Sequence, residues 1–404
     1  MITRPYYPSN ASGVHRSAAN AKYLQHFGWT PVVVCKQFSP ENSDSTYDPQ
    51  LAALPDVCEV IRVRDNGNKT IRKAEIGFWS AFGGGVHDYR YPYMLYHRMK
   101  KASEQIVKSQ RIDAIWTTYL PGLDHKIADY LSRKYGIPWV ADFRDLPDQS
   151  YMNRNIRYVV KQEVKTCSSA KALIAATEEL AEKLKARHEI PVYTVFNGFD
   201  PDEFKTSPKP GDFGDKFTLN HFGILYEYRN PSSLFAAIDL LSRQNKIELN
   251  DIRINFYGAD AQMVSGFARG YSCAPQVQAP RRLSYPKMIE YQKISQVLLI
   301  VTSTGQGGAI PAKLYGYLAS RRPILNIPGD GAGTDRILQQ TKAGISSSDP
   351  EKIAAWLKQA YESWKKTGEV KFSGEDYEIK KYSRKTQAGQ LAEILEKVVA
   401  HNEV

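Results

Sequence analysis

The sequence is poor in cysteine and has no long apolar run. Its 404 residues include only four cysteines, and these are scattered and match no metal-binding spacing: Cys35, Cys58, Cys167 and Cys273. Such usage indicates reduced thiols in a cytoplasm rather than a disulfide framework. No segment approaches the roughly 18 apolar residues of a membrane span, and the N-terminal residues MITRPYYPSN lack the apolar core of a signal peptide. We therefore expect a cytoplasmic protein.

Acidic residues are outnumbered, with 43 Asp and Glu against 54 Lys and Arg, which gives a net charge of +11. Residues 66–111 hold nine of these cations and only three acids, interleaved with seven aromatic residues. Such a segment predicts peripheral contact with an anionic membrane, although a solvated basic face with packed aromatics is an equal alternative. Basic charge also attracts nucleic acid, but no recognition motif accompanies it, and we expect no nucleic-acid partner.

Short apolar runs alternate with amphipathic helical patterns. Five runs rich in β-forming residues occupy 29–35, 112–119, 137–143, 170–177 and 192–197. This alternation predicts an α/β fold with parallel, doubly wound sheets. Residues 200–216 hold three prolines and two glycines, which predicts an interdomain linker. A second α/β series follows, so we expect two tandem Rossmann-like domains, 1–205 and 206–379, facing a central cleft.

The first strand is predicted to be short. Only Met1–Thr3 precede a loop at Pro5–Gly13, where several apolar residues are expected. Either this strand is minimal or the start of the sequence is truncated.

Three polar residues follow predicted strands of the first domain and are candidate catalytic residues: His125, Asp142 and Arg144. Because strand carboxyl ends face the crevice of an open α/β sheet, these side chains are expected there. A histidine there can bind a sugar hydroxyl or share a proton, although it can equally point to solvent. Asp142 and Arg144 can instead form a structural ion pair. Gly13 precedes a helix start, where backbone N–H groups can approach a phosphate, or it belongs to an ordinary turn.

Two cations of the second domain suit a diphosphate. Arg229 follows the glycine turn HFG at 221–223 and can bind in bidentate fashion, and Lys313 lies on the first turn of a predicted helix. Fixed positive charge there stabilises a leaving nucleoside diphosphate. Each cation alone is equally an ordinary surface charge. The backbone near Arg282 and Leu283 can hydrogen-bond a base.

Taken in order, these segments resemble retaining glycosyltransferases of the GT-B fold, of the family-four type. The similarity extends over almost the whole chain, through PYYPSNASGVHRSAANAKYL (5–24), WVADFRDLP (139–147), LIAATEELAEKL (173–184) and FGILYEYRNPSSLFAAI (222–238). Its most specific blocks are NGFDPDEF (197–204) and AKLYGYLASRRPIL (312–325).

The resemblance implies a nucleotide-sugar donor in the second domain, an acceptor in the first, and a C-terminal helix within 380–404 that crosses back onto the first domain. Arg229 and Lys313 would then hold the donor diphosphate, and the Gly13 loop would approach the phosphates or the sugar. The backbone of three residues would approach the transferred sugar: Gly308, Ala309 and Ile310. No metal and no further cofactor are expected, because cations and helix ends replace them.

The sequence departs from the family at two carboxylates. The family carries a pair of glutamates, one near the sugar and one on the ribose, where this chain has Gly308 and Gly316. A glycine inside a helix costs about 1 kcal/mol against alanine, so Gly316 does not serve helix stability. A different donor, a backbone or water substitute, and impaired catalysis are the competing explanations.

The predicted function is retaining transfer of a sugar from a nucleotide-sugar to a glycan or lipid-linked acceptor, in cell-surface polysaccharide or glycoconjugate synthesis. Its place would be the cytoplasm, at the inner face of the membrane. The alternative is a non-catalytic GT-B protein that binds a glycan or scaffolds a glycosyltransferase complex, as the two missing carboxylates suggest. A nucleotide-sugar epimerase would need more carboxylates in the cleft than the sequence offers.

Overall fold

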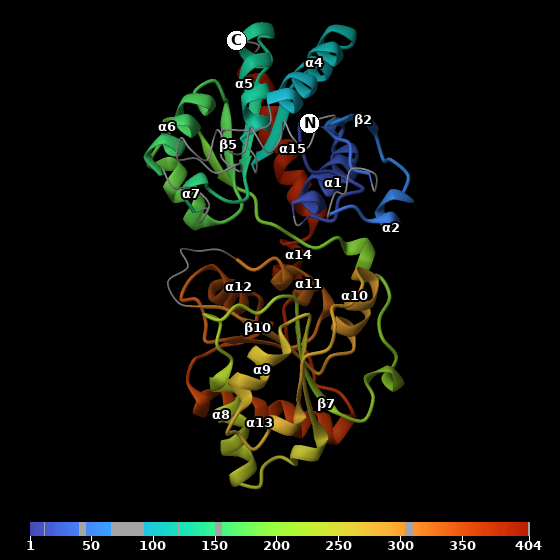
Figure 1. The fold of residues 1–404 in the computed structure, drawn as a ribbon, viewed down its shortest axis with the longest axis vertical. Helices are drawn as coiled ribbons and strands as arrows, with labels where there is room; N and C mark the ends of the chain where they lie inside the picture. The colour runs from blue at the N-terminus through green and yellow to red at the C-terminus, as the bar shows by residue number, and fades with distance from the viewer. Residues whose placement is uncertain are drawn as a thin grey trace. The chain divides into compact units, whose positions relative to one another are not determined.

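The computed structural model describes residues 1–11, 13–39, 46–65, 93–119, 122–149, 156–303 and 310–402. The chain divides into two compact units (Figure 1). The N-terminal unit comprises Met1–Asn197 together with Arg384–Val404, and the C-terminal unit comprises Gly198–Ser383. The sequence predicted these boundaries at 205/206 and 379/380.

The N-terminal unit is built on a parallel sheet in two parts. One part pairs β1 (Val32–Lys36) with β2 (Glu59–Val63), and the other has the order β3 (Ile115–Tyr119), β4 (Trp139–Phe143), β5 (Ala172–Ala175), β6 (Val192–Thr194). Ile2 joins the parts, because it forms parallel bridges to both Val34 and Thr117. The first strand is therefore minimal in this structure, a single bridged residue between β1 and β3.

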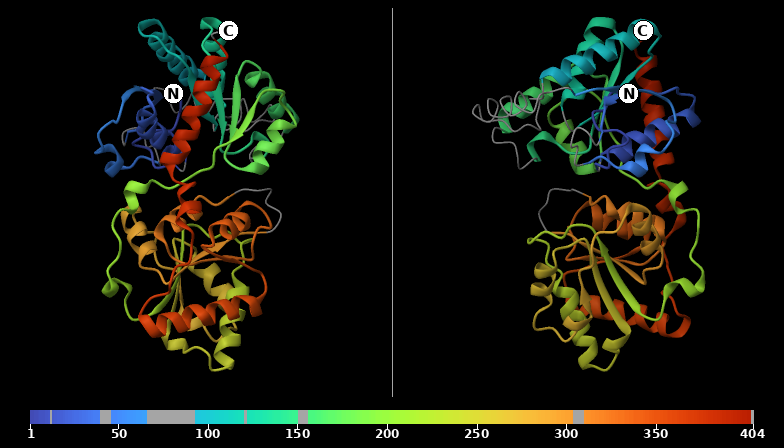
Figure 2. Two further views of the ribbon diagram at one scale, coloured as in Figure 1. Left: turned by 180° about the vertical axis from the view of Figure 1, so that it is seen from behind. Right: turned by 45° about the vertical axis from the view of Figure 1, so that its right-hand side comes forward.

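Helices cover both faces of this sheet. On one face lie α4 (Tyr93–Ser109), α5 (Leu123–Tyr135), α6 (Ile156–Cys167) and α7 (Glu178–Lys185), and on the other α1 (Val14–Tyr23), the short helix Leu24–Phe27 and α15 (Arg384–Ala400). The red α15 lies beside the blue α1 in Figure 2. A single turn of helix, α2 (Pro49–Ala52), precedes β2, and a short one at Pro147–Gln149 follows β4.

Strand β4 shows how the alternation of side chains divides this unit. Trp139, Ala141 and Phe143 belong to the core under α5 and α6, whereas Val140 belongs to the core under α15. Successive strand residues point to opposite faces. Asp142 therefore shares the face of Val140, which is the side of α1.

The C-terminal unit has one six-stranded sheet, parallel throughout. Its order is β12 (Gly344–Ser346), β11 (Ile324–Ile327), β10 (Val297–Val301), β7 (Phe217–Phe222), β8 (Ile252–Tyr257), β9 (Val277–Gln278). In chain order this is the strand sequence of a dinucleotide-binding Rossmann sheet, with the reversal between β7 and β10. The structure thus confirms the predicted α/β class with parallel, doubly wound sheets.

The helices of this unit also lie on both sides. Buried residues of α8 (Ser232–Arg243), α9 (Ala261–Ala268) and α13 (Pro350–Thr367) form one core with the sheet. Three further helices follow the later strands, and α14 precedes the return to the N-terminal unit: α10 (Tyr285–Lys293), α11 (Lys313–Ser320), α12 (Gly333–Thr341) and α14 (Asp376–Lys380). Helix α11 is tied to β7 because the backbone N–H of Phe222 donates to the Tyr317 hydroxyl, 3.0 Å away.

The predicted linker at 200–216 is not a free connection. These residues belong to the C-terminal unit and form short helical turns at Pro201–Phe204 and Pro210–Phe213. Asp200 caps the first turn by accepting from the N–H of Asp202. Phe213 is buried beneath the guanidinium of Arg322, 4.6 Å from its ring centre. The prolines therefore initiate anchored turns, and the aromatic residues between them supply the packing that the composition did not reveal.

Within the described parts of the chain, no helix is long and apolar enough to cross a membrane. Of the basic segment 66–111, only the portion from residue 93 onward, with α4, lies among the described residues.

Candidate functional site

A cavity of about 530 Å³ lies in the C-terminal unit. Phe222 and Gly223, at the end of β7, and Tyr257 and Gly258, at the end of β8, form one wall. The residues that lead into α11, from Ile310 to Lys313, form another. The cavity therefore sits at the carboxyl ends of the strands beside the β7/β10 reversal, where open α/β sheets bind their ligands.

Lys313 enters this cavity from the first position of α11. Its Nζ lies 2.9 Å from Nε2 of His221, a fully buried residue of β7. Burial, reinforced by the nearby Arg229, lowers the pKa of Lys313 to about 7. A lysine so placed gains strongly from any anion that enters the cavity.

Arg229 lines the same cavity and lies beside two stacked tyrosine rings, whose centres are 5.4 Å apart. Its guanidinium carbon is 5.3 Å from the ring centre of Tyr226 and 5.7 Å from that of Tyr228. The two rings are parallel within 6° and remain 45% and 56% exposed. Stacking on the rings orients the guanidinium, and the exposed ring faces can receive a flat or apolar surface of a ligand.

The remaining predicted donor-binding residues divide into two groups. Arg282, Leu283 and Ile310 line the cavity, whereas Gly308 and Ala309 lie outside the described residues. Arg282 packs close to the end of β8, since a side chain at Gly258, where φ is +83°, would lie 3.4 Å from the Arg282 Cβ. Among the lining residues that the structure describes there are three cations and no carboxylate.

Gly316 does not line this cavity. Its α carbon faces helix α10, because a Cβ built there would lie 3.2 Å from Oε1 of Gln292 and 3.9 Å from the ring of Phe204. The glycine thus lets α10 and α11 approach closely. Its predicted place in the donor site is therefore not supported, and a carboxylate at this position would first have to displace Gln292.

In the N-terminal unit, Gly13 and Arg144 are brought together. Gly13 is the residue before α1, and a Cβ on it would lie only 1.7 Å from Nη1 of Arg144. The guanidinium therefore occupies the space that a side chain would fill, and its Nε donates to the carbonyl of Tyr119, 2.9 Å away. An Arg packed against a helix N-terminus makes an electropositive position, which keeps an anion-binding role for this pair as a prediction.

Asp142 is fully buried in an ion pair, and its partner is Arg16 rather than Arg144. Nε and Nη2 of Arg16 lie 2.7 and 3.0 Å from the two carboxylate oxygens. The same guanidinium donates to the carbonyls of Val195 and Phe196. Nothing local in the sequence signals that Arg16 has a partner 126 positions away.

His125 is a core residue. It is 0% exposed and packs against the rings of Tyr119, Trp139 and Phe143. Burial lowers its pKa to about 3, so the ring is neutral at ordinary pH. The sheet separates it from Asp142, which faces α1. The predicted catalytic trio is therefore not assembled, and the geometry supports a packing role for His125.

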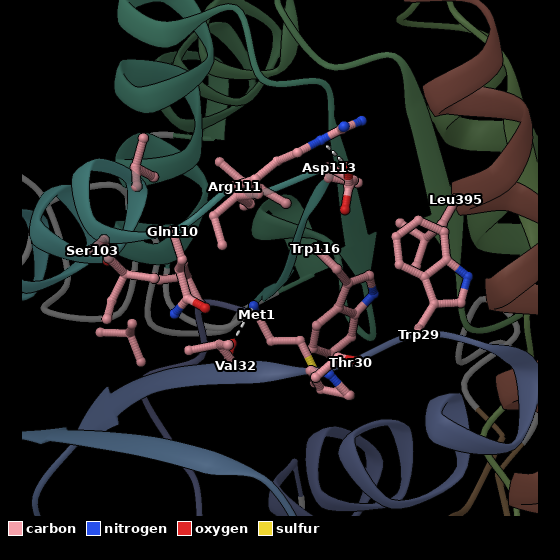
Figure 3. Close-up of a pocket in the computed structure, with 18 of the residues that line it drawn as sticks. Met1, Trp29, Thr30, Val32, Ser103, Gln110, Arg111, Asp113, Trp116 and Leu395 are labelled. Carbon is pink, nitrogen blue, oxygen red and sulfur yellow. Dashed lines mark hydrogen bonds and ion pairs between the residues drawn. The ribbon is translucent and has the colours of Figure 1, made fainter.

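A second cavity, of about 270 Å³, lies in the N-terminal unit (Figure 3). Trp29 and Trp116 flank it, and the amine of Met1 donates within it to the carbonyl of Val32, 2.7 Å away. Val32 and Ile115 are the first residues of β1 and β3, so this cavity marks the amino ends of the strands. It lies at the edge opposite to the strand ends that precede Gly13 and Arg144.

The structure describes no group of three or more His, Cys, Asp or Glu side chains arranged to hold a metal ion. Three residues of the site were not predicted from the sequence: His221, Tyr226 and Tyr228. A histidine inside the apolar strand FTLNHF was the available signal for His221, since a buried polar side chain needs a partner.

Each unit is Rossmann-like and contains a parallel sheet, and the C-terminal unit has a basic cavity at its strand reversal. This is the architecture of the GT-B fold. No protein-family model matches this chain, and no curated protein shows significant sequence similarity to it.

Solved structures do resemble it over nearly its full length. A sucrose-phosphate synthase from Thermosynechococcus elongatus matches with a TM-score of 0.66 and 12% identity, over 99% of each chain. HepE of Anabaena, solved in complex with UDP, matches with a TM-score of 0.64 and 13% identity, over 98% of each chain. A glycosyltransferase from Rickettsia africae matches with 0.61 and 13%, also over 98% of each. At these identities the likeness establishes the GT-B fold, and the family-four assignment stays a prediction.

Proposed function

We propose that this chain is a glycosyltransferase that binds a nucleoside-diphosphate sugar in the cavity of its C-terminal unit. The observation that carries this proposal is the cavity itself, with Lys313, Arg229 and Arg282 around it and no carboxylate among its described lining residues. The solved complexes of HepE with UDP and with UDP-glucose support the same class of donor. A uridine donor is therefore the first to test.

In this proposal the diphosphate binds Lys313 and Arg229. Charge develops on the leaving phosphate as the sugar–oxygen bond breaks, and fixed cations stabilise it. The departing phosphate oxygen then accepts the proton of the acceptor hydroxyl on the same face of the sugar, which retains the anomeric configuration. The two cations and the N-terminal end of α11 take the place of a metal.

The base would bind toward Arg282 and Leu283, which line the cavity next to the end of β8. Because Gly316 faces Gln292 rather than the cavity, the ribose would be held without the carboxylate that the family supplies there. Donor affinity would then depend more heavily on the diphosphate contacts.

Calorimetric titration with UDP, GDP and ADP tests donor binding. We expect UDP or another nucleoside diphosphate to bind. Arg229→Met should lower its affinity about tenfold or more, because a charge-assisted hydrogen bond contributes about 1.5–3 kcal/mol. Arg243→Met is the matched control, since Arg243 is 81% exposed on α8 and outside the cavity. Binding of none of these nucleotides, or equal losses in both variants, would refute the proposed donor site.

Hydrolysis and transfer assays with nucleotide-sugars then separate an enzyme from a binding protein. We expect slow release of the nucleoside diphosphate without an acceptor and faster release with one. Donor binding with no turnover on any glycan or lipid-linked acceptor would favour the non-catalytic alternative.

We further propose a lipid-linked or membrane-proximal glycan acceptor, reached by docking of the basic segment 66–111 on anionic lipid. The described part of that segment supports this, because Lys101 and Lys108 lie exposed on α4. Flotation with vesicles containing phosphatidylserine should recover the protein at low salt, and Lys101→Glu with Lys108→Glu should reduce recovery. The control pair is Lys352→Glu with Lys366→Glu on α13, and equal effects of both pairs would contradict the docking surface.

A further inference from the structure

The partner of the Lys313 ammonium in the described part of the cavity is an imidazole rather than a carboxylate. We propose that His221 is a positioning residue that holds Lys313 in the diphosphate subsite as a hydrogen-bond donor ready for phosphate oxygen. This inference rests on the proposed function, because the ligand of Lys313 is taken to be the donor diphosphate.

The hydrogen bonds of His221 fix which ring nitrogen carries the proton. Nδ1 lies 3.0 Å from the carbonyl oxygen of Leu299 on β10. A carbonyl can only accept, so Nδ1 bears the hydrogen. An ammonium can only donate, so Nε2, 2.9 Å from Nζ of Lys313, presents its lone pair. The ring is therefore neutral, and both of its nitrogens are satisfied.

The backbone around the pair leaves room for this contact. Gly223, two residues beyond His221, has φ of +110°, and a Cβ there would lie 3.4 Å from Nζ of Lys313. The strand end thus passes within van der Waals contact of the lysine. At its other end Lys313 is fixed as the first residue of α11. Both ends of the side chain are therefore determined.

An ammonium has three N–H donors. In the part of the cavity that the structure describes, one of them is committed to His221, which leaves two for oxygens of a ligand. A neutral acceptor orients the lysine without neutralising it. A carboxylate in the same place would compete with the incoming phosphate for the same charge.

Five other titratable groups line the described part of the cavity with Lys313: Tyr226 and Arg229 from the loop after β7, Tyr257 from β8, Arg282 from the loop before α10, and Tyr285 from α10. Burial and Arg229 together lower the pKa of Lys313 to about 7, and burial holds the pKa of His221 well below its usual range. A bound diphosphate restores the charged lysine. Binding should therefore take up a proton, and affinity should fall as the pH rises above about 7.

The test compares His221→Gln with His221→Met. Both side chains are unbranched and similar in length, but only glutamine offers an oxygen acceptor to Lys313. We expect His221→Met to bind UDP about tenfold more weakly near pH 7, in line with the loss of one charge-assisted hydrogen bond. We expect His221→Gln to stay within about threefold of the native protein on the same scale.

A readout beyond affinity separates positioning from general damage. Calorimetry in two buffers of different ionisation enthalpy gives the protons taken up on UDP binding. We expect uptake by the native protein and by His221→Gln, with an altered uptake in His221→Met. Equal affinity and uptake in all three proteins, or equal loss in both variants, would overturn the inference.

Measurements on the ligand-free protein keep this inference distinct from the proposed function. If neither UDP nor inorganic pyrophosphate binds, the proposed function fails, and the nitrogen NMR signal of His221 Nε2 still tests the contact. That signal should be shifted by its hydrogen bond in the native protein and should move in Lys313→Met, which removes the Nζ–Nε2 contact and leaves His221 in place. No difference between the two spectra would overturn the inference even where His221→Met fails to fold.

Discussion

Replacing Lys313 by methionine should make the ligand-free protein more stable and should lower its affinity for the proposed ligand. The lysine is charged, half-buried and placed near Arg229, and its hydrogen-bond partner is a neutral ring. Such a residue costs folding free energy at neutral pH, and a bound anion recovers it. Functional sites commonly carry destabilising charge of this kind.

The magnitude follows from the pKa. Lys313 shifts from 10.5 to about 7. At about 1.4 kcal/mol for each pKa unit, the full shift would amount to about 5 kcal/mol against the charged lysine. Because the side chain keeps some solvent contact, we expect about 3 kcal/mol. Loss of the hydrogen bond to His221 offsets about 1 kcal/mol, so Lys313→Met should gain about 2 kcal/mol.

The pH dependence gives this prediction its sign. Between the folded pKa and 10.5 the unfolded chain holds a proton that the folded protein has released, so native stability rises with pH in that window. The electrostatic part of the advantage of Lys313→Met should thus be complete at about pH 6.5 and fall to about a third by pH 9.5, where the lost hydrogen bond to His221 roughly cancels it. Urea denaturation of both proteins at the two pH values measures it.

Lys287→Met is the control, because Lys287 is exposed on α10 and pairs with Glu290 at the surface. It should change stability little at either pH. If Lys313→Met were destabilised, or stabilised equally at both pH values, the argument that burial of charge dominates at this position would be refuted.

Three further predictions concern the N-terminal unit. Burial raises the pKa of Asp124 to about 7, so between pH 3.8 and 7 the folded protein holds a proton that the unfolded chain has released, and stability falls as the pH rises. In urea denaturation, Asp124→Asn should be about 2–4 kcal/mol more stable than the native protein at about pH 8. Below pH 3.8 the two proteins should be equally stable. Gly13→Ala should cost about 1–3 kcal/mol in thermal unfolding, because its Cβ meets Arg144, and Arg144→Ala in the same chain should remove most of that cost; an additive double variant would contradict the contact. Arg16→Met should cost about 3–5 kcal/mol by leaving the Asp142 carboxylate buried without its partner, and adding Asp142→Leu should recover stability, whereas a further loss would argue against a mainly electrostatic effect.

The parallel α/β architecture was predictable because it depends on local patterns. Runs such as 137–143 and 170–177 are short, apolar and bounded by turn residues, and β4 and β5 lie within them. Such runs need only be buried on both faces to form a parallel strand. The same kind of local argument wrongly predicted a free linker at 200–216, because the prolines there start helical turns and Phe213 is buried.

The donor cavity was partly predictable. Arg229, Lys313, Arg282, Leu283 and Ile310 line one cavity, since they follow strands or start helices at the carboxyl edge of one sheet. That edge gathers segments distant in sequence at a place that strand order determines. The predicted roles of these residues in donor binding remain to be tested.

Side-chain pairing was decided only by the tertiary structure. The sequence placed His125 and Asp142 together at strand ends, but His125 of α5 packs on the Trp139 and Phe143 face of β4, and Asp142 points to the opposite face. Arg16 and His221 carried no local signal of their partners, which lie 126 and 92 residues away. By itself, the sequence indicates a lost carboxylate at Gly316. The close packing against Gln292 explains why a glycine stands there.

The sequence by itself thus determined the α/β class, the approximate strand positions and the basic residues that gather around the cavity. These follow from hydrophobic periodicity and from chain punctuation, which act over a few residues. The tertiary structure alone decided that Lys313 rests on a neutral His221, that Asp142 binds Arg16, and that His125 is buried. Such pairings depend on which faces meet across strands distant in sequence, and no local pattern encodes that geometry.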